Sequence, residues 1–496
     1  MAALISLEGT GPLKRRLALG LKAAIHAGRL QPGARAPSSR ELAGALGVSR
    51  NVVLAAYEEL TAEGYFRGRT GAGTFVSAAP PTLRAERARR SVSRSNEGKG
   101  AVEAPTLSAF GKRAGELAPH RDFQDAGPRS RIDFQYWQVA PDPEAVREWG
   151  RLARARLRSP RFAYAEAAGA SELRKAIATH IAAARAIDVH EDDVMIVSGA
   201  QQALDLVART VLDAGDRVLL EEPHYQGARQ SFLAAGARLT AAPVDEAGLN
   251  LSKVPARECK LVYATPSHQF PTGAAMPFGR RLETLQWCRS AGAWLLEDDY
   301  DSEYQHDGKR LAALRALDPE RVIYVATFAR AFAPSLRLGF VIAPAALREA
   351  LTASKWLADR GSAAFEQLVL ADFIEAGCYD RHLRRMGKIY GEKRERLVAA
   401  IEREFGDEAD VTGASAGIHV FVWLNMRRPN DGPEIVSEGR ALGVGVYSGC
   451  RYFSAMPPRG GFLLGYATTP MNRIDDGIAR FAHAWRAYSK GKPLRT

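Results

Sequence analysis

Cysteine is scarce in this chain, and long hydrophobic runs are absent from it. The 496 residues include four scattered cysteines, Cys259, Cys288, Cys378 and Cys450, with no CxxC pair and no spacing typical of a metal site. This usage fits a reducing cytoplasm and inert thiols, and it predicts no metal. No run of about 18 apolar residues is present to span a membrane, and the N-terminus lacks the apolar stretch and cleavage site of a signal peptide. We therefore expect a cytoplasmic protein without a membrane segment.

The excess of basic over acidic residues lies almost entirely at one end of the chain. Residues 1–131 contain 21 Lys and Arg against 11 Asp and Glu, whereas residues 132–496 contain 47 against 45. A basic end is expected where a chain meets a polyanion, but it is also the composition of a solvated tail, so the motifs must decide. The length of the chain fits two or three domains.

Three regions differ in composition. Residues 1–77 alternate helical periodicity with turn signals. Residues 78–131 are rich in Ala, Arg, Ser and Pro without a sustained apolar period, which predicts a flexible basic linker. In residues 132–496, strand-like apolar runs such as DVMIVSG and AWLLEDD alternate with amphipathic helices. This alternation predicts an α/β domain with a mostly parallel sheet covered by helices.

The first region has the signals of a winged helix-turn-helix. We expect helices over Leu13–Ala27, over the RELAGAL segment after Ser38 or Ser39, and from Ser49 to Gly64. A tight Gly-Val turn joins the second helix to the third, as in a helix-turn-helix. The segment YFRGRTGAGTFVS then predicts two short strands around a glycine-rich tip, which is a wing.

In such a fold the third helix enters the major groove through its first residues. Here these are Ser49, Arg50 and Asn51, where Arg50 can contact a guanine edge or a phosphate and Asn51 an adenine edge or a phosphate. Further residues are expected at the DNA surface, namely Arg35, Ser39, Arg40, Arg67 and Arg69. The alternative is a small helical domain whose arginines are merely solvated. The complete order of helices and wing favours binding to double-stranded DNA.

A family resemblance supports this interpretation. The string GRLQPGARAPSSRELAGALGVSRNVVLAAYEELTAEGYFRGRTGAGTFV resembles the winged helix-turn-helix of GntR-type bacterial regulators, and the match covers essentially all of residues 12–77. One departure is Ala36, where the family usually has Leu; it weakens a core contact and touches no DNA residue.

The third region carries a series of motifs at predicted strand ends. SGAQQALD, at residues 198–205, follows a strand and opens a helix, so its backbone N–H groups can meet a phosphate. Tyr225, in EEPHYQG, can stack on a planar ring. YATPSHQFPTG, LLEDDYDSEY and TFARAFAPSLRLG follow, each ending a strand, at the edge where α/β sheets bind ligands. Each motif taken alone can be purely structural.

Taken in order, these motifs resemble aminotransferases of the first pyridoxal-phosphate (PLP) fold type. Together with the N-terminal region, the whole chain apart from the linker resembles a MocR/GabR-type transcription regulator. The resemblance implies a fold type I domain over residues 132–496 with a small C-terminal α/β subdomain. It also implies a homodimer, because Tyr164 matches a tyrosine that in this fold reaches the phosphate in the partner subunit.

The resemblance also implies roles for individual residues. Asp298 would hold the pyridinium nitrogen of PLP, Tyr300 would donate to the phenolic oxygen, and Tyr225 would stack on the ring. The turn at His268 and Gln269 would lie beside them. The phosphate would be held by the backbone N–H groups of Ala200 and Gln201, by Thr327 and by Arg337.

One departure from the family matters more than these matches. The family's segment reads approximately TFSK, and its lysine bonds covalently to PLP, whereas this chain has Ala329 and Arg330 at the last two positions. Transaminases need an amine that becomes neutral and attacks an aldehyde, and a guanidinium, with a pKa above about 12, does not do so. The strand GFLLGYA carries no arginine to clamp a substrate carboxylate, and Arg459, in a Pro/Gly turn, is a poor substitute.

The sequence therefore leaves three hypotheses. The first is a DNA-binding regulator that senses a small molecule through a non-catalytic domain with no catalytic residue, holding PLP non-covalently or as an adduct with an amino compound. The second is a working aminotransferase fused to a DNA-binding domain, which Arg330 disfavours. The third is a regulator that has abandoned PLP and binds another anionic effector in the same cleft, where Arg330 can clamp it.

Overall fold

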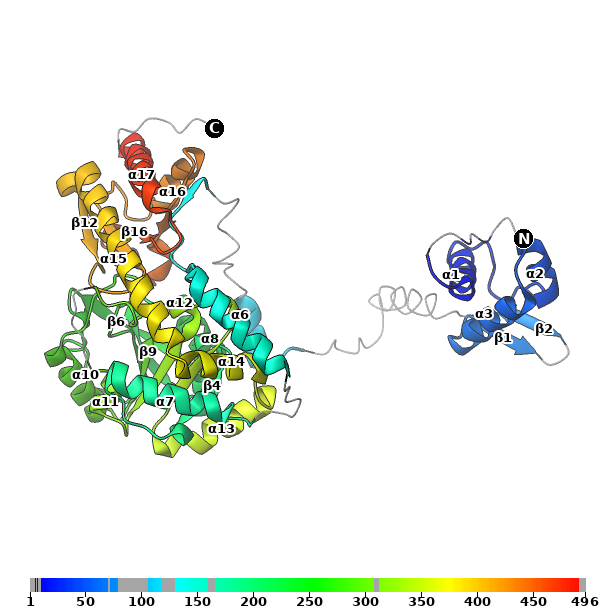
Figure 1. Cartoon of the computed structure of the whole chain (residues 1–496), viewed down its shortest axis with the longest axis horizontal. Helices are drawn as coiled ribbons and strands as arrows, with labels where there is room; N and C mark the ends of the chain where they lie inside the picture. Colours follow the sequence, from blue (N-terminus) through cyan, green and yellow to red (C-terminus); the bar gives the residue numbers. More distant parts are fainter. Residues whose placement is uncertain are drawn as a thin grey trace, which may run out of the picture. The chain divides into compact units, whose positions relative to one another are not determined.

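A computed structural model describes residues 5, 7, 10–69, 72–78, 106–117, 130–158, 166–306 and 312–489. Its contacts divide the chain into two compact units, Met1–Thr106 and Leu107–Thr496 (Figure 1). Each unit has its own buried core. Within the described residues, no helix combines the length and the apolar character that crossing a membrane requires.

The N-terminal unit is a winged helix-turn-helix, as predicted. Its elements are α1 (Leu13–His26), α2 (Ser39–Leu46), α3 (Arg50–Ala62), β1 (Phe66–Arg69) and β2 (Gly73–Val76). The two strands form an antiparallel hairpin in which Phe66 pairs with Val76. Apolar residues at helical spacing in the three helices meet Phe66 and Val76 in one core, which explains why so short a segment folds compactly.

Local signals in the sequence fix where the two helices of this motif begin. Ser38, rather than Ser39, caps α2: its hydroxyl accepts from the Glu41 N–H at 3.2 Å, and the Glu41 carboxylate accepts from the Ser38 N–H at 2.9 Å. Gly47 ends α2 in the left-handed conformation, which glycine adopts without strain. The Ser49 hydroxyl then caps α3 by accepting from the Val52 N–H at 3.4 Å.

The C-terminal unit is built on a mostly parallel sheet, also as predicted. Its strands are, in spatial order, β4 (Val194–Val197), β11 (Gly339–Ile342), β10 (Val322–Thr327), β9 (Trp294–Asp299), β8 (Leu261–Ala264), β5 (Arg217–Glu222), β6 (Arg238–Asp245) and β7 (Gly248–Leu249). The pairs from β10 through β6 are parallel, whereas β11 runs antiparallel to both β10 and β4. Both faces are buried, which explains the continuous apolar runs in the sequence.

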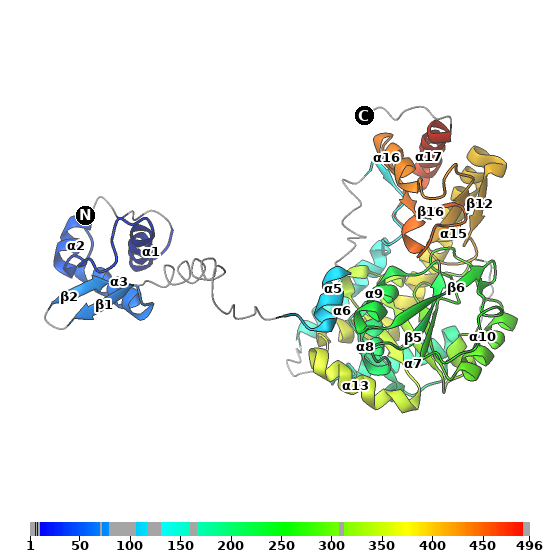
Figure 2. The same ribbon diagram turned by 180° about the vertical axis from the view of Figure 1, so that it is seen from behind.

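Helices cover the two faces of this sheet. Side chains alternate between the faces, so that Ile196 of β4 packs with α7 (Ser171–Arg185) and α14 (Ala364–Glu375) while Val197 packs with α8 (Ala200–Val211) and α9 (Gln226–Ala235). Figure 1 shows the first pair of helices in front of the sheet, and Figure 2 shows the second pair from behind. The other helices around this sheet are α6 (Pro143–Arg158), α10 (Phe278–Ala291), α11 (Leu314–Leu317), α12 (Phe328–Ala331) and α13 (Ala345–Asp359).

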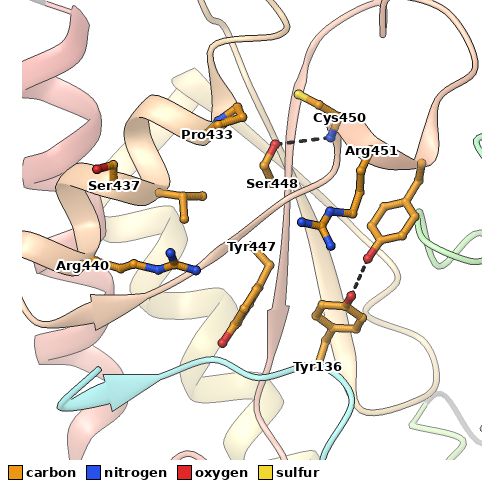
Figure 3. Close-up of a pocket in the computed structure, with 10 residues that line it drawn as sticks. Tyr136, Pro433, Ser437, Arg440, Tyr447, Ser448, Cys450 and Arg451 are labelled. Atoms are coloured by element: carbon orange, nitrogen blue, oxygen red, sulfur yellow. Dashed lines mark hydrogen bonds between the residues drawn. The ribbon is translucent and has the colours of Figure 1, made fainter. Parts of the chain in front are cut away.

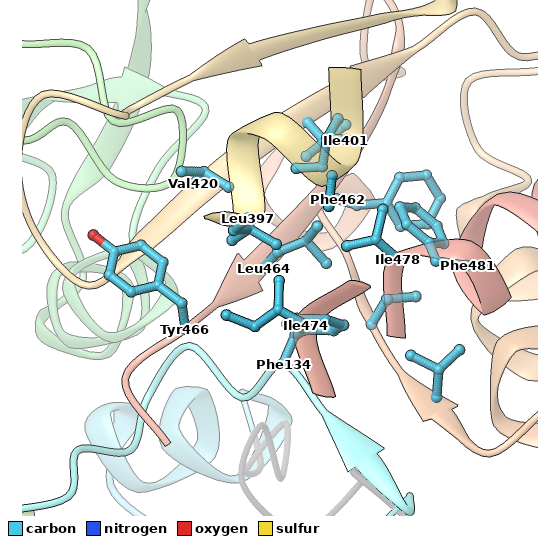
Figure 4. Packing of buried hydrophobic residues seen from close by; sticks show 14 of the residues in the cluster. Phe134, Leu397, Ile401, Val420, Phe462, Leu464, Tyr466, Ile474, Ile478 and Phe481 are labelled. Carbon is cyan, nitrogen blue, oxygen red and sulfur yellow. The ribbon is translucent and has the colours of Figure 1, made fainter. Parts of the chain in front are cut away.

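A smaller subdomain follows, as the family resemblance implied. It has an antiparallel sheet in the order β12 (Ala409–Thr412), β13 (His419–Leu424), β16 (Gly460–Gly465) and β15 (Tyr447–Ser448). Its helices are α15 (Cys378–Phe405), α16 (Gly432–Ala441) and α17 (Ile474–Ser489). Leu397, Val420, Phe462 and Phe481 belong to its buried core (Figure 4). Each large apolar side chain so buried contributes about 1.5–3 kcal/mol relative to exposure.

Residues from the start of the unit complete this subdomain. Strand β3 (Ile132–Asp133) pairs in parallel with β14 (Val444–Gly445). Phe134, which follows β3, is fully buried in the subdomain core. The small subdomain is therefore assembled from two parts of the chain that are far apart in sequence.

Residues 78–131 were predicted to be a flexible linker, but part of this segment forms a helix in the structure. Helix α5 (Ala109–Glu116) belongs to the C-terminal unit, where Arg113 Nε donates to the Ala234 carbonyl at 2.9 Å and the Arg209 guanidinium lies 5.9 Å from the centre of the Phe110 ring. A helix this short is not stable alone, so its contacts with α8 and α9 stabilise it. The amino-acid composition of the segment did not indicate these contacts. Residues 79–105 and 118–129 of the predicted linker lie outside the described residues.

Candidate ligand site and DNA-binding surface

The candidate ligand site lies where neighbouring parallel strands end. Strands β8, β9 and β10 are adjacent, and their carboxyl ends lie at the same edge of the sheet. These strand ends and the segments that follow them bring His268, Asp298, Tyr300 and Arg330 to one place, as a hydrogen bond and electrostatic contacts among them show. These residues belong to the strand-end motifs that the sequence and the family resemblance singled out.

Asp298 is the most informative residue of the site. Its side chain is buried, and one oxygen, Oδ2, accepts from the Tyr263 hydroxyl at 2.8 Å. The other oxygen, Oδ1, is buried without a hydrogen-bond partner among the described residues. Burial raises the pKa of Asp298 to about 7, while the Tyr263 hydroxyl opposes the shift. An unpaired buried carboxylate oxygen is costly, so this atom fits a ligand that supplies an N–H, such as a pyridinium.

Tyr300 is held beside Asp298 by a polar network. Its hydroxyl lies 3.2 Å from His268 Nδ1, which also lies 2.9 Å from Asp301 Oδ2. The side-chain atoms with which His268, Asp301 and His419 could coordinate a metal lie within 4.8 Å of one another. Burial lowers the pKa of His419 well below its usual value, and the charges of His268 and Arg330 lower it further. We interpret the cluster as the support that orients Tyr300, because hydrogen bonds already engage these groups.

Gln269 has a different role from the one the resemblance implied. Its side chain is fully buried in the protein: Nε2 donates to the Pro223 carbonyl at 2.9 Å and to Glu221 Oε2 at 3.2 Å, and Oε1 accepts from the Thr272 hydroxyl at 2.6 Å. Gln269 therefore holds the turn in shape and does not line the site. The sequence could place the turn but not the direction in which its side chains point.

The opposite end of the site is suited to a phosphate. Helix α8 begins at Ala200 without a side-chain cap, so its first backbone N–H groups are positioned for an anion. Arg337 has a left-handed backbone (φ 51°), and its guanidinium donates to the Ser198 carbonyl at 3.1 Å, beside this helix start. The Gln201 side chain turns away to the Ser231 hydroxyl at 2.8 Å, which leaves only its backbone for a ligand. The Thr327 hydroxyl accepts from the Ala329 N–H at 3.2 Å, at the start of α12.

Aromatic residues that the sequence analysis did not single out close the site. The Phe270 ring lies 5.6 Å from the Tyr225 ring, 6.0 Å from the Tyr300 ring and 6.1 Å from the Tyr136 ring. Tyr136 comes from the FQYWQV segment after β3, and its hydroxyl is hydrogen-bonded to that of Tyr452 (Figure 3). In the sequence, only the aromatic residues of this segment hinted at a contact with the site, because the residues they meet lie far away along the chain.

Arg330 lies in the site, at the position where the resemblance implied a lysine. Its guanidinium donates to the Tyr136 carbonyl, and its charge acts on both Asp298 and Tyr300. Arg459, in contrast, pairs with Asp410 and is not available as a clamp. Tyr164 lies outside the described residues.

The predicted DNA-binding residues lie together on the N-terminal unit. Arg50 and Asn51 are exposed in the first turn of α3, and Arg50 Nε donates to the Ser39 hydroxyl at 3.2 Å. This bond links the start of α3 to the start of α2. The remaining predicted cations, all of them exposed, are Arg35, Arg40, Arg67 and Arg69.

Arg69 of the wing and Arg35, which precedes α2, both contact residues of β2. The Arg69 guanidinium lies 5.1 Å from the centre of the Phe75 ring. A methyl group added at Gly73 would come within 3.2 Å of Arg35 Nε, so the absence of a side chain there lets Arg35 lie over β2. The unit therefore presents a set of cations suited to a phosphate backbone.

Comparisons with known proteins agree with both parts. Residues 13–76 match the family described as bacterial regulatory proteins, gntR family, and residues 137–437 match the family described as aminotransferase class I and II. Among solved structures, the α-aminoadipate aminotransferase LysN of Thermus thermophilus superposes with a TM-score of 0.70 at 28% identity, over 77% of this chain and 100% of that one.

Two curated relatives match along almost the whole chain. The chain is 35% identical to the "Probable rhizopine catabolism regulatory protein MocR" of Rhizobium meliloti, over 97% of this chain and 96% of that protein. It is 34% identical to the HTH-type transcriptional regulator TauR of Rhodobacter capsulatus, over 96% of this chain and 97% of the relative. The chain thus belongs to the MocR/GabR family of DNA-binding transcription regulators, in which a gntR-type winged helix-turn-helix precedes a domain of the aminotransferase class I and II fold.

Proposed function

We propose that the aminotransferase-like domain of this regulator is a non-catalytic sensor that holds PLP, or an adduct of PLP with an amino compound, without a covalent bond to the protein. The observation that carries the proposal is the Oδ1 atom of Asp298, which is buried without a hydrogen-bond partner among the described residues. In the same site Arg330 lies where the family resemblance implied a lysine. A solved relative is complexed with N-(5'-phosphopyridoxyl)-L-leucine, and another relative is named as a pyridoxine biosynthesis regulator, which supports a ligand of this class.

The residues that would hold PLP divide into three groups. Asp298 would accept from the ring nitrogen, while Tyr225 would cover the ring and Tyr300, oriented by His268, would donate to the phenolic oxygen. At the other end, the phosphate would meet the cluster made of the Ala200 and Gln201 backbone, Thr327 and Arg337. When bound, PLP supplies an aldehyde that condenses with amines. The protein's own residues bind and orient it, and Arg330 contributes charge without acting as a nucleophile.

The chain would act as a homodimer, with Tyr164 reaching the phosphate in the partner subunit. Two winged domains on one dimer would then recognise paired half-sites on DNA. Sedimentation of the full chain should give twice the monomer mass of 53.9 kDa. A monomer that still binds PLP would contradict this part of the proposal.

Replacing Asp298 with Asn should weaken PLP binding about 10- to 100-fold, because a hydrogen bond to a charged group contributes about 1.5–3 kcal/mol. Asn can still accept from Tyr263, so the fold is preserved. Equilibrium dialysis of the full-length protein with PLP measures the change, and Asp410→Asn, at an exposed residue of the small subdomain, is the control. PLP affinity unchanged by Asp298→Asn would remove the central contact of the proposal.

The same variant should change how the ligand-free protein responds to pH. The raised pKa of Asp298, about 7, means that the neutral carboxyl favours folding below the usual Asp value, and that this stabilisation is lost as the pH rises through about 7. Asn does not titrate, so Asp298→Asn should become more stable relative to the natural chain between about pH 4 and pH 7. Thermal melts across this range test the sign, and a parallel pair of curves would contradict it.

Arg50→Ala should weaken operator binding by about 1–3 kcal/mol if Arg50 contacts a base. Fluorescence anisotropy on the natural upstream region, with competing random DNA, separates a base contact from a phosphate contact, because only the former changes specificity. Arg15→Ala is a matched control, since Arg15 is an exposed arginine of α1 outside the helix-turn-helix pair. An unchanged affinity would argue against α3 as the recognition helix.

A further inference from the structure

Helix α6 carries a line of arginines on its outward side. Arg147, Arg151, Arg154 and Arg158 are spaced at i, i+4, i+7 and i+11, and all four are exposed. At 3.6 residues per turn they fall within about 60° of arc around the helix axis. Figure 1 shows α6 running across the outer surface of the C-terminal unit. These four residues form the arginine stripe.

The stripe lies opposite the face by which α6 packs on the rest of the unit. Ala145 and Leu152 are buried, and the helical period places them on the far side of the axis from the stripe. Arg156 belongs to that packed side, where its Nε and one terminal nitrogen donate to the two carboxylate oxygens of Asp372 at 2.6 and 2.5 Å. One arginine of the run RLARARLR therefore holds the helix in place, while those of the stripe face outward.

The contacts that the stripe makes within the protein are weak ones. Arg151 lies 3.0 Å from Glu148, but both side chains are exposed, and such a pair contributes at most about 1 kcal/mol. Arg154 Nε donates to the Gly150 carbonyl of its own helix at 3.3 Å, one bond among the five that a guanidinium can donate. The other two arginines of the stripe form no ion pair within the part of the chain that the structure describes. A phosphate can replace or join these contacts at little cost.

The stripe is unfavourable for the protein taken alone. Its members are i,i+3 and i,i+4 neighbours of like charge, and each such pair destabilises a helix by about 0.2–0.5 kcal/mol. The rest of the unit does not share this charge, since residues 132–496 contain 47 basic and 45 acidic residues. The stripe is thus a local concentration of charge, and a bound polyanion would relieve its repulsion.

The dimensions of the stripe fit the backbone of duplex DNA. From Arg147 to Arg158 the helix rises about 16 Å, at 1.5 Å per residue. This length corresponds to about five nucleotides of one strand, which are 3.4 Å apart along the duplex axis. Gly150 and Ala155 lie beside the stripe, so small residues flank the guanidinium groups and leave room for a strand to approach. Guanidinium groups bind phosphate with paired hydrogen bonds.

We propose that the arginine stripe of α6 is a second DNA-contact surface, which binds the phosphate backbone of duplex DNA without reading its sequence. The winged unit then supplies the specificity, and the aminotransferase-like domain adds affinity that is the same for every sequence. This surface goes beyond the proposed sensor function and does not depend on PLP.

The test compares the full-length chain with a stripe variant that combines Arg147→Gln, Arg151→Gln, Arg154→Gln and Arg158→Gln. Fluorescence anisotropy measures binding to the natural upstream region and to a random-sequence duplex of the same length, over a series of KCl concentrations. Each lost phosphate contact lowers the slope of log K against log salt by about 0.9, so the slope should fall by about 2–4. Affinity at about 0.1 M salt should fall about tenfold or more, by the same factor for both duplexes.

A charge-matched control separates the stripe from net charge. It removes four exposed cations elsewhere in the same unit, through Lys253→Gln, Arg257→Gln, Lys260→Gln and Arg428→Gln, and it should keep the slope of the natural chain. Thermal melts of both variants should match that of the natural chain, because every change is at an exposed position.

Three results would overturn the proposal. The first is a stripe variant whose affinity and salt slope are unchanged. The second is a control variant that loses as much affinity as the stripe variant, which would make the effect one of net charge. The third is a loss of affinity accompanied by a lower mass in sedimentation, which would show that the stripe joins copies of this chain rather than DNA.

Discussion

Changing Ala329 to Ser and Arg330 to Lys together should produce a protein that borohydride links covalently to PLP at residue 330, whereas the natural chain should give no such product. The guanidinium of Arg330 stays protonated and cannot attack an aldehyde. A lysine amine in the same place, beside a partly desolvated site, becomes neutral and nucleophilic. Serine at 329 adds a hydroxyl donor at the start of α12, near Thr327. The contacts of Asp298, Tyr300 and Arg337 are unaltered.

Mass analysis of peptides after borohydride reduction measures this change, from undetectable to near-complete labelling. Arg330→Met is the control, because it removes the charge and supplies no amine. A pyridoxyl group trapped on the natural chain would mean that another lysine reaches the cofactor. The cofactor site would then have been assigned to the wrong residues. If the double variant does not bind PLP at all, the cleft is shaped for a different anionic ligand, and the third hypothesis from the sequence replaces the first.

Replacing Arg185 with Leu should lower the free energy of unfolding of the C-terminal unit by about 3–5 kcal/mol, because it leaves a buried carboxylate without its counter-charge. Arg185 Nε lies 2.8 Å from Asp299 Oδ2, and both side chains are almost completely buried. The same carboxylate oxygen accepts from the Tyr324 hydroxyl at 2.6 Å. Asp299 follows Asp298 on β9, so the ion pair lies directly beneath the candidate site.

Denaturant unfolding of the full chain, with probes for the C-terminal unit, measures this loss. The double variant Arg185→Leu with Asp299→Leu should be less destabilised than Arg185→Leu alone, because it removes the uncompensated charge. Arg151→Leu breaks an exposed ion pair with Glu148 and should cost less than about 1 kcal/mol. A cost below about 1 kcal/mol for Arg185→Leu would show that Asp299 is not desolvated in the folded protein.

The parts of the molecule that the sequence predicted correctly depend on local signals. Ser49 and Gly47 determine helix ends through contacts within a few residues, so the helix-turn-helix was readable without any tertiary information. The edge of the sheet that carries the site was predictable from a simple rule. Neighbouring parallel strands have their carboxyl ends at the same edge of the sheet, whichever helices cover its faces. Asp298 and Tyr300 followed from this rule and from the family resemblance.

Features that depend on distant contacts were not predictable. Tyr136 and Tyr452 share a hydrogen bond across 316 positions of sequence, and nothing near either residue indicates the other. Gln269 is part of a recognisable turn, but the neighbours that engage its side chain, Glu221 and Pro223, come from another strand and the turn after it. Helix α5 lies in a stretch whose composition is that of a linker, and its contact with Ala234 stabilises it. In each case packing, rather than local preference, decides the outcome.

The pairing of β3 with β14 has a mechanical consequence. The polypeptide that leads from the winged unit is held first at α5, on the helices that cover the central sheet, and then at β3, in the small subdomain. A hinge motion of the small subdomain would therefore carry the second of these anchors with it. Tyr136 lies four residues beyond Ile132, and its carbonyl accepts from Arg330 of the candidate site. Closure of the small subdomain on an effector would thus shift β3 relative to α5, while the attachment at α5 would stay with the central sheet.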